Sequence, residues 1–269
     1  MTIFNFNKSK INNSVKLFNP QKHDRENLPL LIYLPGMDGT GKLLSTQIED
    51  LKPHFNLRCL SISPTDLSTW KQLTTFTIDC LQQELSVNKF SRIYLCGESF
   101  GGCLAMLVTT TAPQIFDGTI LINAASSFNQ QPILSLGINL IGSIPEWLHR
   151  NSAVNLLPFL AALNRIEQSD RLSLLNAMKY LPQNVVSWRL SLLRDFMITP
   201  SLCYRFKQPT LIIASACDRL LPSVKEAFKL QSLFPNSRVE ILPNSGHACL
   251  LETDVSLASI LSKHDFLIG

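Results

Sequence analysis

Charged residues are scarce in this sequence of 269 residues: Asp, Glu, Lys and Arg together make up only 16% of it. The net charge is +4, and Lys and Arg form no run of the kind that binds nucleic acid, so no nucleic-acid partner is expected. Hydrophobic residues, in contrast, make up 45% of the chain. This balance is typical of one large globular domain with an extensive apolar core.

The seven cysteines include no CxxC pair, which argues against a zinc site, and their odd number argues against a disulfide framework. We therefore predict reduced, mostly buried thiols, and we predict no metal and no organic cofactor. The cysteines stand at positions 59, 80, 96, 103, 203, 217 and 249.

No uninterrupted apolar stretch approaches the 18 residues that a membrane-spanning helix requires. Residues 1–27 also lack the continuous apolar region and the small-residue cleavage site of a secretory signal. We expect a cytoplasmic protein whose contact with membranes, if it has any, is peripheral. The sequence does not predict its oligomeric state.

Short apolar runs with β-type composition alternate with longer helical patterns, which is the signature of a parallel sheet with crossover helices. The fold class is therefore α/β, with a mostly parallel central sheet flanked by helices. The predicted strands are Leu28–Leu34, Leu57–Ile62, Arg92–Cys96, Thr119–Asn123, Thr210–Ala214 and Arg238–Leu242. The predicted helices are Lys42–Leu51, Trp70–Val87, Phe100–Thr111, Ser223–Leu233 and Thr253–Phe266.

Residues 126–208 interrupt this alternation, because the segment is far longer than a crossover needs and carries several Leu-rich stretches. A structureless loop of that length is implausible in a compact domain. We predict a single domain spanning residues 1–269, with residues 126–208 inserted in it as a helical lid. Between Gln130 and Gln208 the segment holds eight Lys and Arg residues against four acidic ones. The stretches are broken by Pro145, Pro158, Pro182 and Pro200.

The run Gly97-Glu98-Ser99-Phe100-Gly101 fits the pattern G-x-S-x-G. It follows one predicted strand and opens a predicted helix, which is the setting of a nucleophile elbow. There the serine occupies a tight, strained turn at the helix N-terminus, where backbone N–H groups stabilise an oxyanion. The alternative is a glycine-rich turn that holds a serine by chance. The strand and helix on either side favour Ser99 as a nucleophile.

A serine nucleophile needs a base, and the base needs an orienting acid. In folds with a nucleophile elbow of this kind, the acid follows the serine and precedes the base in the chain. His247 is the candidate base, because it stands in a turn-forming stretch between the last predicted strand and helix. Asp218 is the candidate acid, because it follows the predicted strand that ends at residue 214. Asp218 could alternatively pair with Arg219 or cap the next helix, and Asp195 is the second candidate acid. Cys217 and Cys249, beside the acid and the base, are interpreted as small packing residues.

The glycine-rich loop Leu34-Pro-Gly-Met-Asp-Gly-Thr-Gly41 follows the first long predicted strand. A loop in that position supplies the second oxyanion N–H, so Met37 and Phe100 are the predicted oxyanion-hole residues. A phosphate-binding loop is the competing interpretation. It fails because Leu43 stands where that motif needs Ser or Thr to hold Mg²⁺. Asp38 either bonds within the turn or contacts the substrate's leaving group.

Three stretches together resemble a known family: Leu34–Gly41, Gly97–Cys103 and Asn123–Phe128. They look like the α/β-hydrolase part of plant plastid phytyl ester synthases and their cyanobacterial relatives. The resemblance begins near Leu28, continues to the C-terminus and implies the α/β-hydrolase fold and acyl chemistry on lipids. From it and the loop chemistry, the candidate substrate-binding residues are Gly36, Asp38, Ser126 and Phe128.

The plant enzymes transfer acyl groups to phytol and diacylglycerol, and they carry a second, acyltransferase-type domain with a His-x₄-Asp motif. We expect this chain to end where that domain would begin, and none of its five histidines has Asp at the fifth following position. The resemblance therefore implies a serine hydrolase that cleaves lipid-like acyl esters and is of the esterase or lipase type.

Two enzymatic alternatives stay open, a thioesterase and an acyltransferase to phytol-like alcohols. A third alternative is a non-catalytic ligand-binding module, because the fold also hosts receptors. The expected partner is a small acyl-lipid substrate. The lid's Leu, Ile and Phe residues with interspersed Arg suit an apolar chain and a peripheral contact with anionic lipid.

Overall fold

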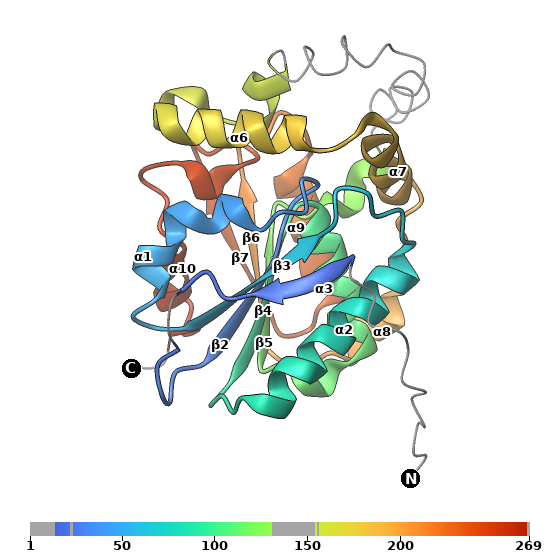
Figure 1. Ribbon diagram of the computed structural model, residues 1–269, viewed down its shortest axis with the longest axis vertical. Helices are drawn as coiled ribbons and strands as arrows, with labels where there is room; N and C mark the ends of the chain where they lie inside the picture. Colours follow the sequence, from blue (N-terminus) through green and yellow to red (C-terminus); the bar gives the residue numbers. More distant parts are fainter. Residues whose placement is uncertain (1–13, 22–23, 131–153, 155, 268–269) are drawn as a thin grey trace.

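A computed structural model describes residues 14–21, 24–130, 154 and 156–267. Residues 131–153 and 155 of the predicted lid, including Pro145, lie outside the described residues, as do residues 1–13 of the N-terminal stretch. The described chain forms one twisted sheet with helices on both faces (Figure 1). The α/β prediction is therefore confirmed.

The sheet has seven strands within the described residues, in the order β1-β3-β2-β4-β5-β6-β7. Strand β1 pairs antiparallel with β3, and every other pairing is parallel. All six predicted strands are present, within two residues of their predicted ends. The strands are β1 (Val15–Phe18), β2 (Leu30–Leu34), β3 (Asn56–Ile62), β4 (Ile93–Glu98), β5 (Gly118–Ile122), β6 (Thr210–Ser215) and β7 (Ser237–Leu242).

Successive side chains of the central strands enter two different hydrophobic cores, because side chains alternate between the faces of a sheet. In β2, Leu30, Ile32 and Leu34 pack on one face, whereas Leu31 and Tyr33 pack on the other. The first face is covered by α2 (Trp70–Val87), α3 (Phe100–Thr111) and α9 (Ser223–Leu233). The second is covered by the 3₁₀-helix η1 (Lys42–Gln47) with α1 (Ile48–Leu51) and by α10 (Leu257–Lys263).

Helices α2, α3 and α9 have the bounds that the sequence predicts. Helix α2 begins where it does because Thr69 and Gln72 form a capping box, in which each side chain binds the other's backbone N–H.

The remaining two helix predictions were wrong in part. Residues 42–51 form a 3₁₀-helix followed by a single α-helical turn, and in this region Gln47 donates its side-chain amide to Leu250 O and Val255 O. The last helix covers Leu257–Lys263 instead of 253–266, because Ser256 caps its start and Asp265, at φ 64°, ends it.

Between β5 and β6 the described chain forms the 3₁₀-helices η3 (Ala125–Gln130) and η4 (Leu163–Arg165), and the helices α6 (Gln168–Tyr180), α7 (Gln183–Arg194) and α8 (Pro200–Arg205). We call residues 126–208 the β5–β6 segment. Helices α6 and α7 lie beyond one end of the sheet (Figure 1). In the described ranges, no helix is both long and apolar enough to cross a membrane.

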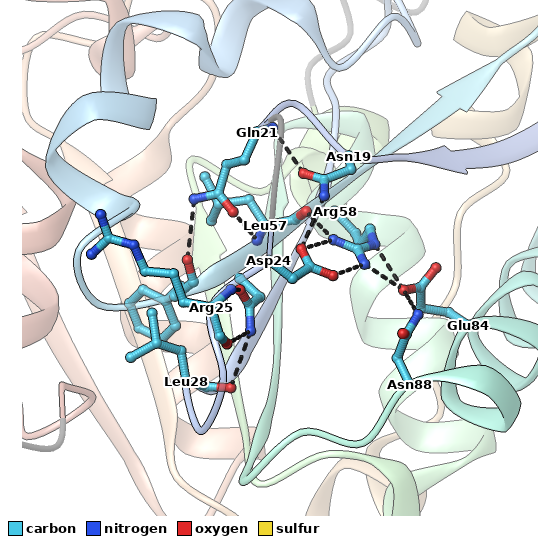
Figure 2. Close-up of polar contacts among 11 residues, drawn as sticks. Asn19, Gln21, Asp24, Arg25, Leu28, Leu57, Arg58, Glu84 and Asn88 are labelled. Carbon is cyan, nitrogen blue, oxygen red and sulfur yellow. Dashed lines mark hydrogen bonds and ion pairs between the residues drawn. The ribbon is translucent and has the colours of Figure 1, made fainter.

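A network of polar contacts ties the chain before β2 to β3 and α2 (Figure 2). Arg58 on β3, whose side chain is only 6% exposed, donates two hydrogen bonds to Asp24, of 2.8 and 2.6 Å, and one of 2.8 Å to Glu84. These bonds hold the pKa of Asp24 below its ordinary value. Asn88 donates a further bond to the same Glu84 oxygen. A single cation thus neutralises carboxylates from two separate segments.

Substituting Arg58 by Met is expected to lower the free energy of unfolding at pH 7 by about 1–3 kcal/mol, because two partly buried carboxylates lose their cation. The contribution from Asp24 is complete above its unfolded pKa, and it is lost as the pH falls through the lowered folded pKa. The difference between wild type and variant should therefore shrink below about pH 4. Urea unfolding at several pH values measures it.

Arg205→Met is the control, because Arg205 is exposed on α8. An Arg58 variant no less stable than this control would contradict the importance of the network.

Candidate active site

Ser99 lies at the junction of β4 and α3, where it is the N-cap of α3. Its backbone has φ 54° and ψ −113°, a conformation that residues with side chains rarely adopt. Such a residue costs about 1–3 kcal/mol and persists only where its surroundings hold it. Here Ser99 N–H donates to Ile122 O over 2.9 Å, and Ser99 O accepts from Ala125 N over 3.1 Å. Strand β5 and the turn after it therefore hold the strained residue.

The two glycines of the motif let three backbone segments approach one another. A Cβ at Gly97 would lie 2.3 Å from Gly101 O and 2.7 Å from the Cβ of Ala105. A Cβ at Gly101 would lie 2.1 Å from Leu34 O. Since real Cβ contacts are never this short, any larger residue would push α3 away from β4 and β2. The spacing of G-x-S-x-G is thus a packing requirement of the elbow.

The side chains of Ser99, His247 and Asp218 form one hydrogen-bonded chain. His247 Nε2 lies 2.9 Å from Ser99 Oγ, and His247 Nδ1 lies 2.7 Å from Asp218 Oδ2. Each residue comes from a loop or turn directly after a parallel strand, namely β4, β6 and β7. The carboxyl ends of parallel strands meet at one edge of the sheet, which is where α/β proteins gather their sites.

The charges around His247 fix its tautomer. Burial raises the pKa of Asp218, whereas His247 and the hydroxyl of Ser223 lower it by more than burial raises it. The net pKa of Asp218 therefore lies below its ordinary value. Asp218 is then an ionised acceptor and requires Nδ1 of His247 to carry the proton. Nε2 is left as the acceptor for the Ser99 hydroxyl. This arrangement can remove a proton from Ser99.

The pKa of His247 itself is shifted upward. Burial lowers it, whereas Asp218 and then Glu98 raise it, and the net pKa lies above its ordinary value. An imidazole with a raised pKa is a stronger base and binds a proton from Ser99 more readily.

Asp218 also organises its own loop. Its Oδ1 accepts from Leu220 N and Leu221 N over 2.8 and 3.0 Å, and its Oδ2 accepts from the Ser223 hydroxyl. The alternative in which Asp218 caps the next helix was wrong, because α9 has Pro222 as its N-cap and no side-chain cap; the carboxylate binds the loop before α9 and His247. Asp195, the second candidate acid, pairs with Arg194 in an exposed position.

The loop after β2 passes beside Ser99, so that a Cβ at Gly36 would lie 3.9 Å from the Ser99 Cβ. The backbone N–H groups of Met37 and Phe100 have no hydrogen-bond acceptor in the part of the chain that the structure describes. Unpaired N–H groups beside a serine can bind an oxyanion. Asp38 accepts hydrogen bonds from the backbone N–H and hydroxyl of Thr40, which places its carboxylate in the turn.

Asn123, directly after β5, connects the acid and base loops, a role that the sequence did not reveal. Its side-chain amide donates to His247 O over 2.7 Å and to Ser215 Oγ over 2.9 Å, while its carbonyl oxygen accepts from Ser215 N. Its backbone has φ 43°, a left-handed value that Asn tolerates better than most residues. That tolerance, its position after a strand and its place in the Asn123–Phe128 stretch are the signals that the sequence offers for it.

Glu98 is a second residue whose part in the site the sequence did not indicate. It is buried beside Ser99, and the Tyr33 hydroxyl donates a hydrogen bond to it. Burial raises the pKa of Glu98, and both Tyr33 and His247 lower it, with a net increase. A second carboxyl group therefore lies within electrostatic range of the imidazole.

Ser126 and Phe128 are buried within the protein. Ser126 donates its hydroxyl to Glu226, and Phe128 packs in the core that contains α3. These contacts favour a structural role, and substrate contact by either residue stays a prediction. Cys249 is buried and Cys217 is exposed, with its thiol donating to Pro243 O.

The chain matches the family model described as serine aminopeptidase, S33, over residues 66–254, a span that includes Ser99, Asp218 and His247. It belongs to this family of α/β-hydrolases. A thermophilic esterase from Thermogutta terrifontis has a similar solved structure, with a TM-score of 0.69 at 16% identity over 94% of this chain and 93% of that chain. At this identity the likeness shows the fold alone.

Two curated relatives are chloroplastic phytyl ester synthases 1 and 2 of Arabidopsis thaliana. They are 31% and 28% identical to this α/β-hydrolase over 88% and 87% of its chain. The match spans only 37% of the length of each relative.

Replacing Asn123 by Ala is expected to lower the free energy of unfolding by about 1–3 kcal/mol, because buried groups of Ser215 and His247 lose their partner. Urea unfolding followed by circular dichroism measures the loss. Asn236→Ala is the matched control, since Asn236 is exposed and donates a single bond to Lys207 O. Its expected effect is within about 0.5 kcal/mol. Equal stabilities for the two variants would contradict the connecting role of Asn123.

Proposed function

We propose that this α/β-hydrolase is a serine esterase or lipase that cleaves acyl esters of lipid-like molecules through an acyl-enzyme. The observation that carries the proposal is the continuous chain from Ser99 through His247 to Asp218, with contacts of 2.9 and 2.7 Å. The strained elbow at Ser99 supports it, because strain of this kind is retained where function requires it.

In the proposed first step, Ser99 Oγ bonds to the ester carbonyl carbon while His247 Nε2 takes the hydroxyl proton. The carbonyl oxygen becomes an oxyanion, which the N–H groups of Met37 and Phe100 stabilise. Asp218 keeps the imidazole in the correct tautomer and stabilises the imidazolium that forms. When the tetrahedral intermediate collapses, the carbon–oxygen bond to the alcohol breaks and His247 gives the alcohol its proton.

In the second step, water attacks the acyl-enzyme carbonyl as His247 removes a proton from it. Collapse of the second intermediate releases the carboxylic acid and returns the proton to Ser99. The chain's own residues supply every proton transfer in this scheme.

The proposed substrate class rests on the β5–β6 segment and on the relatives. We propose that residues 126–208 act as a lid over the site within a single domain. The segment exposes apolar side chains such as Leu156, Phe159 and Leu172, which suits a substrate that arrives from a lipid surface at which the protein binds peripherally. The two relatives named phytyl ester synthases support acyl groups of lipid as the substrate.

Acyl transfer to a long-chain alcohol is the second candidate activity, favoured by the 31% identity to phytyl ester synthase 1. The same acyl-enzyme serves both activities, and only the acceptor differs. If the lid excludes water and admits an alcohol, an ester is formed in place of an acid.

A fluorophosphonate probe is expected to label the wild-type protein at Ser99, because the activated hydroxyl attacks phosphorus as it attacks a carbonyl. Ser99→Ala should abolish both the labelling and the hydrolysis of p-nitrophenyl butyrate, the latter by at least about 10³-fold. Mass spectrometry of the labelled peptide identifies the site.

Ser232→Ala is the control, since Ser232 is an exposed serine on α9. Labelling of Ser99→Ala at the wild-type level would refute the enzymatic proposal and favour a non-catalytic binding module.

The pH dependence of kcat/KM should show a rising limb at a pH above the ordinary histidine pKa of about 6.5, because His247 acts only when neutral and its pKa is raised. Glu98→Gln should move this limb to lower pH, since the Glu98 charge contributes to the raised pKa of His247. Initial rates across a pH series locate the rising limb in the wild type and in Glu98→Gln.

Glu49→Gln, which removes an exposed carboxylate on α1, should leave the limb in place. An unchanged limb in Glu98→Gln would contradict the electrostatic effect of Glu98 on the base.

A further inference from the structure

Arg189 on α7 is a buried cation that contacts the loop after β2. It is only 2% exposed, and its guanidinium donates from Nη1 to Met37 O over 2.6 Å and from Nη2 to Ser63 O over 3.0 Å. Burying a charge is costly unless donors and acceptors are well matched. A cation from the β5–β6 segment therefore binds two backbone carbonyls outside that segment, and one of them lies on the loop beside Ser99.

The contact with Met37 O bears directly on a proposed oxyanion donor. The Met37 N–H shares a peptide plane with Gly36 O, which accepts from Gly39 N over 3.0 Å. Gly39 O in turn accepts from Ile62 N over 2.7 Å. Arg189 binds the carbonyl in the middle of this turn. Because Gly36 has no side chain to restrict its backbone, the direction of the Met37 N–H depends on these outside contacts.

The glycine-rich sequence of the loop fits around the guanidinium. A Cβ at Gly39 would lie 2.5 Å from Arg189 Nη1, and the φ of Gly39 is 70°. A residue with a side chain would therefore displace the cation from the turn. Burial lowers the pKa of Arg189, and the carboxylates of Asp66 and Asp38 partly offset that effect. The Gly-Met-Asp-Gly run thus provides space, a carbonyl acceptor and a compensating charge for one arginine.

Arg189 also lies against the second proposed oxyanion donor. Its guanidinium carbon is 6.0 Å from the centroid of the Phe100 ring, and Trp70 stacks on the same ring at 4.5 Å. Trp70 donates its indole N–H to Leu192 O, which belongs to α7 as well. Helix α7 therefore contacts the residues on both sides of the site where an oxyanion would form.

We propose that Arg189 is a positioning residue of the oxyanion hole, through which the β5–β6 segment holds the Met37 loop in its catalytic geometry. This inference rests on the proposed function. It predicts that the segment contributes to transition-state stabilisation as well as covering the substrate. An interaction that acts on the oxyanion alone lowers kcat without changing substrate binding.

Arg189→Met and Arg189→Lys test the proposal with p-nitrophenyl butyrate and an alkyl trifluoromethyl ketone. Ser99 Oγ bonds to the carbonyl carbon of the ketone while His247 Nε2 takes the hydroxyl proton, and the ketone oxygen becomes an alkoxide where the oxyanion forms. We expect Arg189→Met to lower kcat by about 10- to 100-fold and to weaken ketone inhibition in parallel, with KM within about threefold. Lys keeps the positive charge but cannot donate to both carbonyls at once. Arg189→Lys should therefore lower kcat and weaken ketone inhibition less than Arg189→Met does.

Arg194→Met is the matched control, because Arg194 is an exposed arginine on the same helix and pairs with Asp195. Its kcat and ketone inhibition should stay within about twofold of wild type. Thermal unfolding of each variant separates positioning from folding, because a merely structural role would change the melting temperature and KM together.

Wild-type kcat and ketone inhibition in a folded Arg189→Met protein would overturn the inference while leaving the esterase proposal intact. If the Met variant does not fold, Arg189→Lys decides in the same way. If neither folds, Arg189 is a folding residue and the inference is overturned. Wild-type protein that neither hydrolyses the ester nor reacts with a fluorophosphonate would overturn the proposed function, and the inference with it.

Discussion

The left-handed backbone of Ser99 is the constraint on which the rest of the site depends. A serine at φ 54° stays there because β5 accepts a hydrogen bond from its N–H and Ala125, after β5, donates one to its carbonyl. Gly97 and Gly101 also let β4, α3 and β2 meet without a Cβ between them. The parallel sheet supplies this rigidity, since its central strands are buried on both faces. The strain of about 1–3 kcal/mol is small beside the packing that enforces it.

Around this elbow several ionisable groups are buried or half-buried, and four of them have a specific partner. Asp218 contacts His247, Glu98 contacts Tyr33, Asp38 contacts Thr40, and Arg189 contacts two carbonyls. A low-dielectric site strengthens these interactions and makes any unpaired charge costly. The loops at the carboxyl end of the sheet are therefore stabilised by polar contacts in addition to apolar packing.

Local patterns in the sequence were sufficient for most of the fold. Near-continuous apolar runs mark the parallel strands, and helices α2, α3 and α9 have the predicted bounds because helical spacing of apolar residues and, in α2, a capping box act within a few residues. Strand β1 was missed because Val15–Phe18 is short, contains Lys16 and gains its order from pairing with β3. The helix predicted over residues 42–51 was altered by distant partners of Gln47, some 203 residues away.

The sequence by itself determined the elbow at Ser99 and the candidates His247 and Asp218, because chain order and strand–turn–helix context are local signals. Only the tertiary structure decided which acid reaches the imidazole, and that Asn123 and Arg189 hold the surrounding loops. The physical reason is separation along the chain. Asn123 binds a carbonyl 124 residues away, and Arg189 binds one 152 residues away. A hydrogen bond between residues so far apart produces no pattern in the sequence around either residue. Such contacts exist only once the sheet and its two helical layers have brought the loops together.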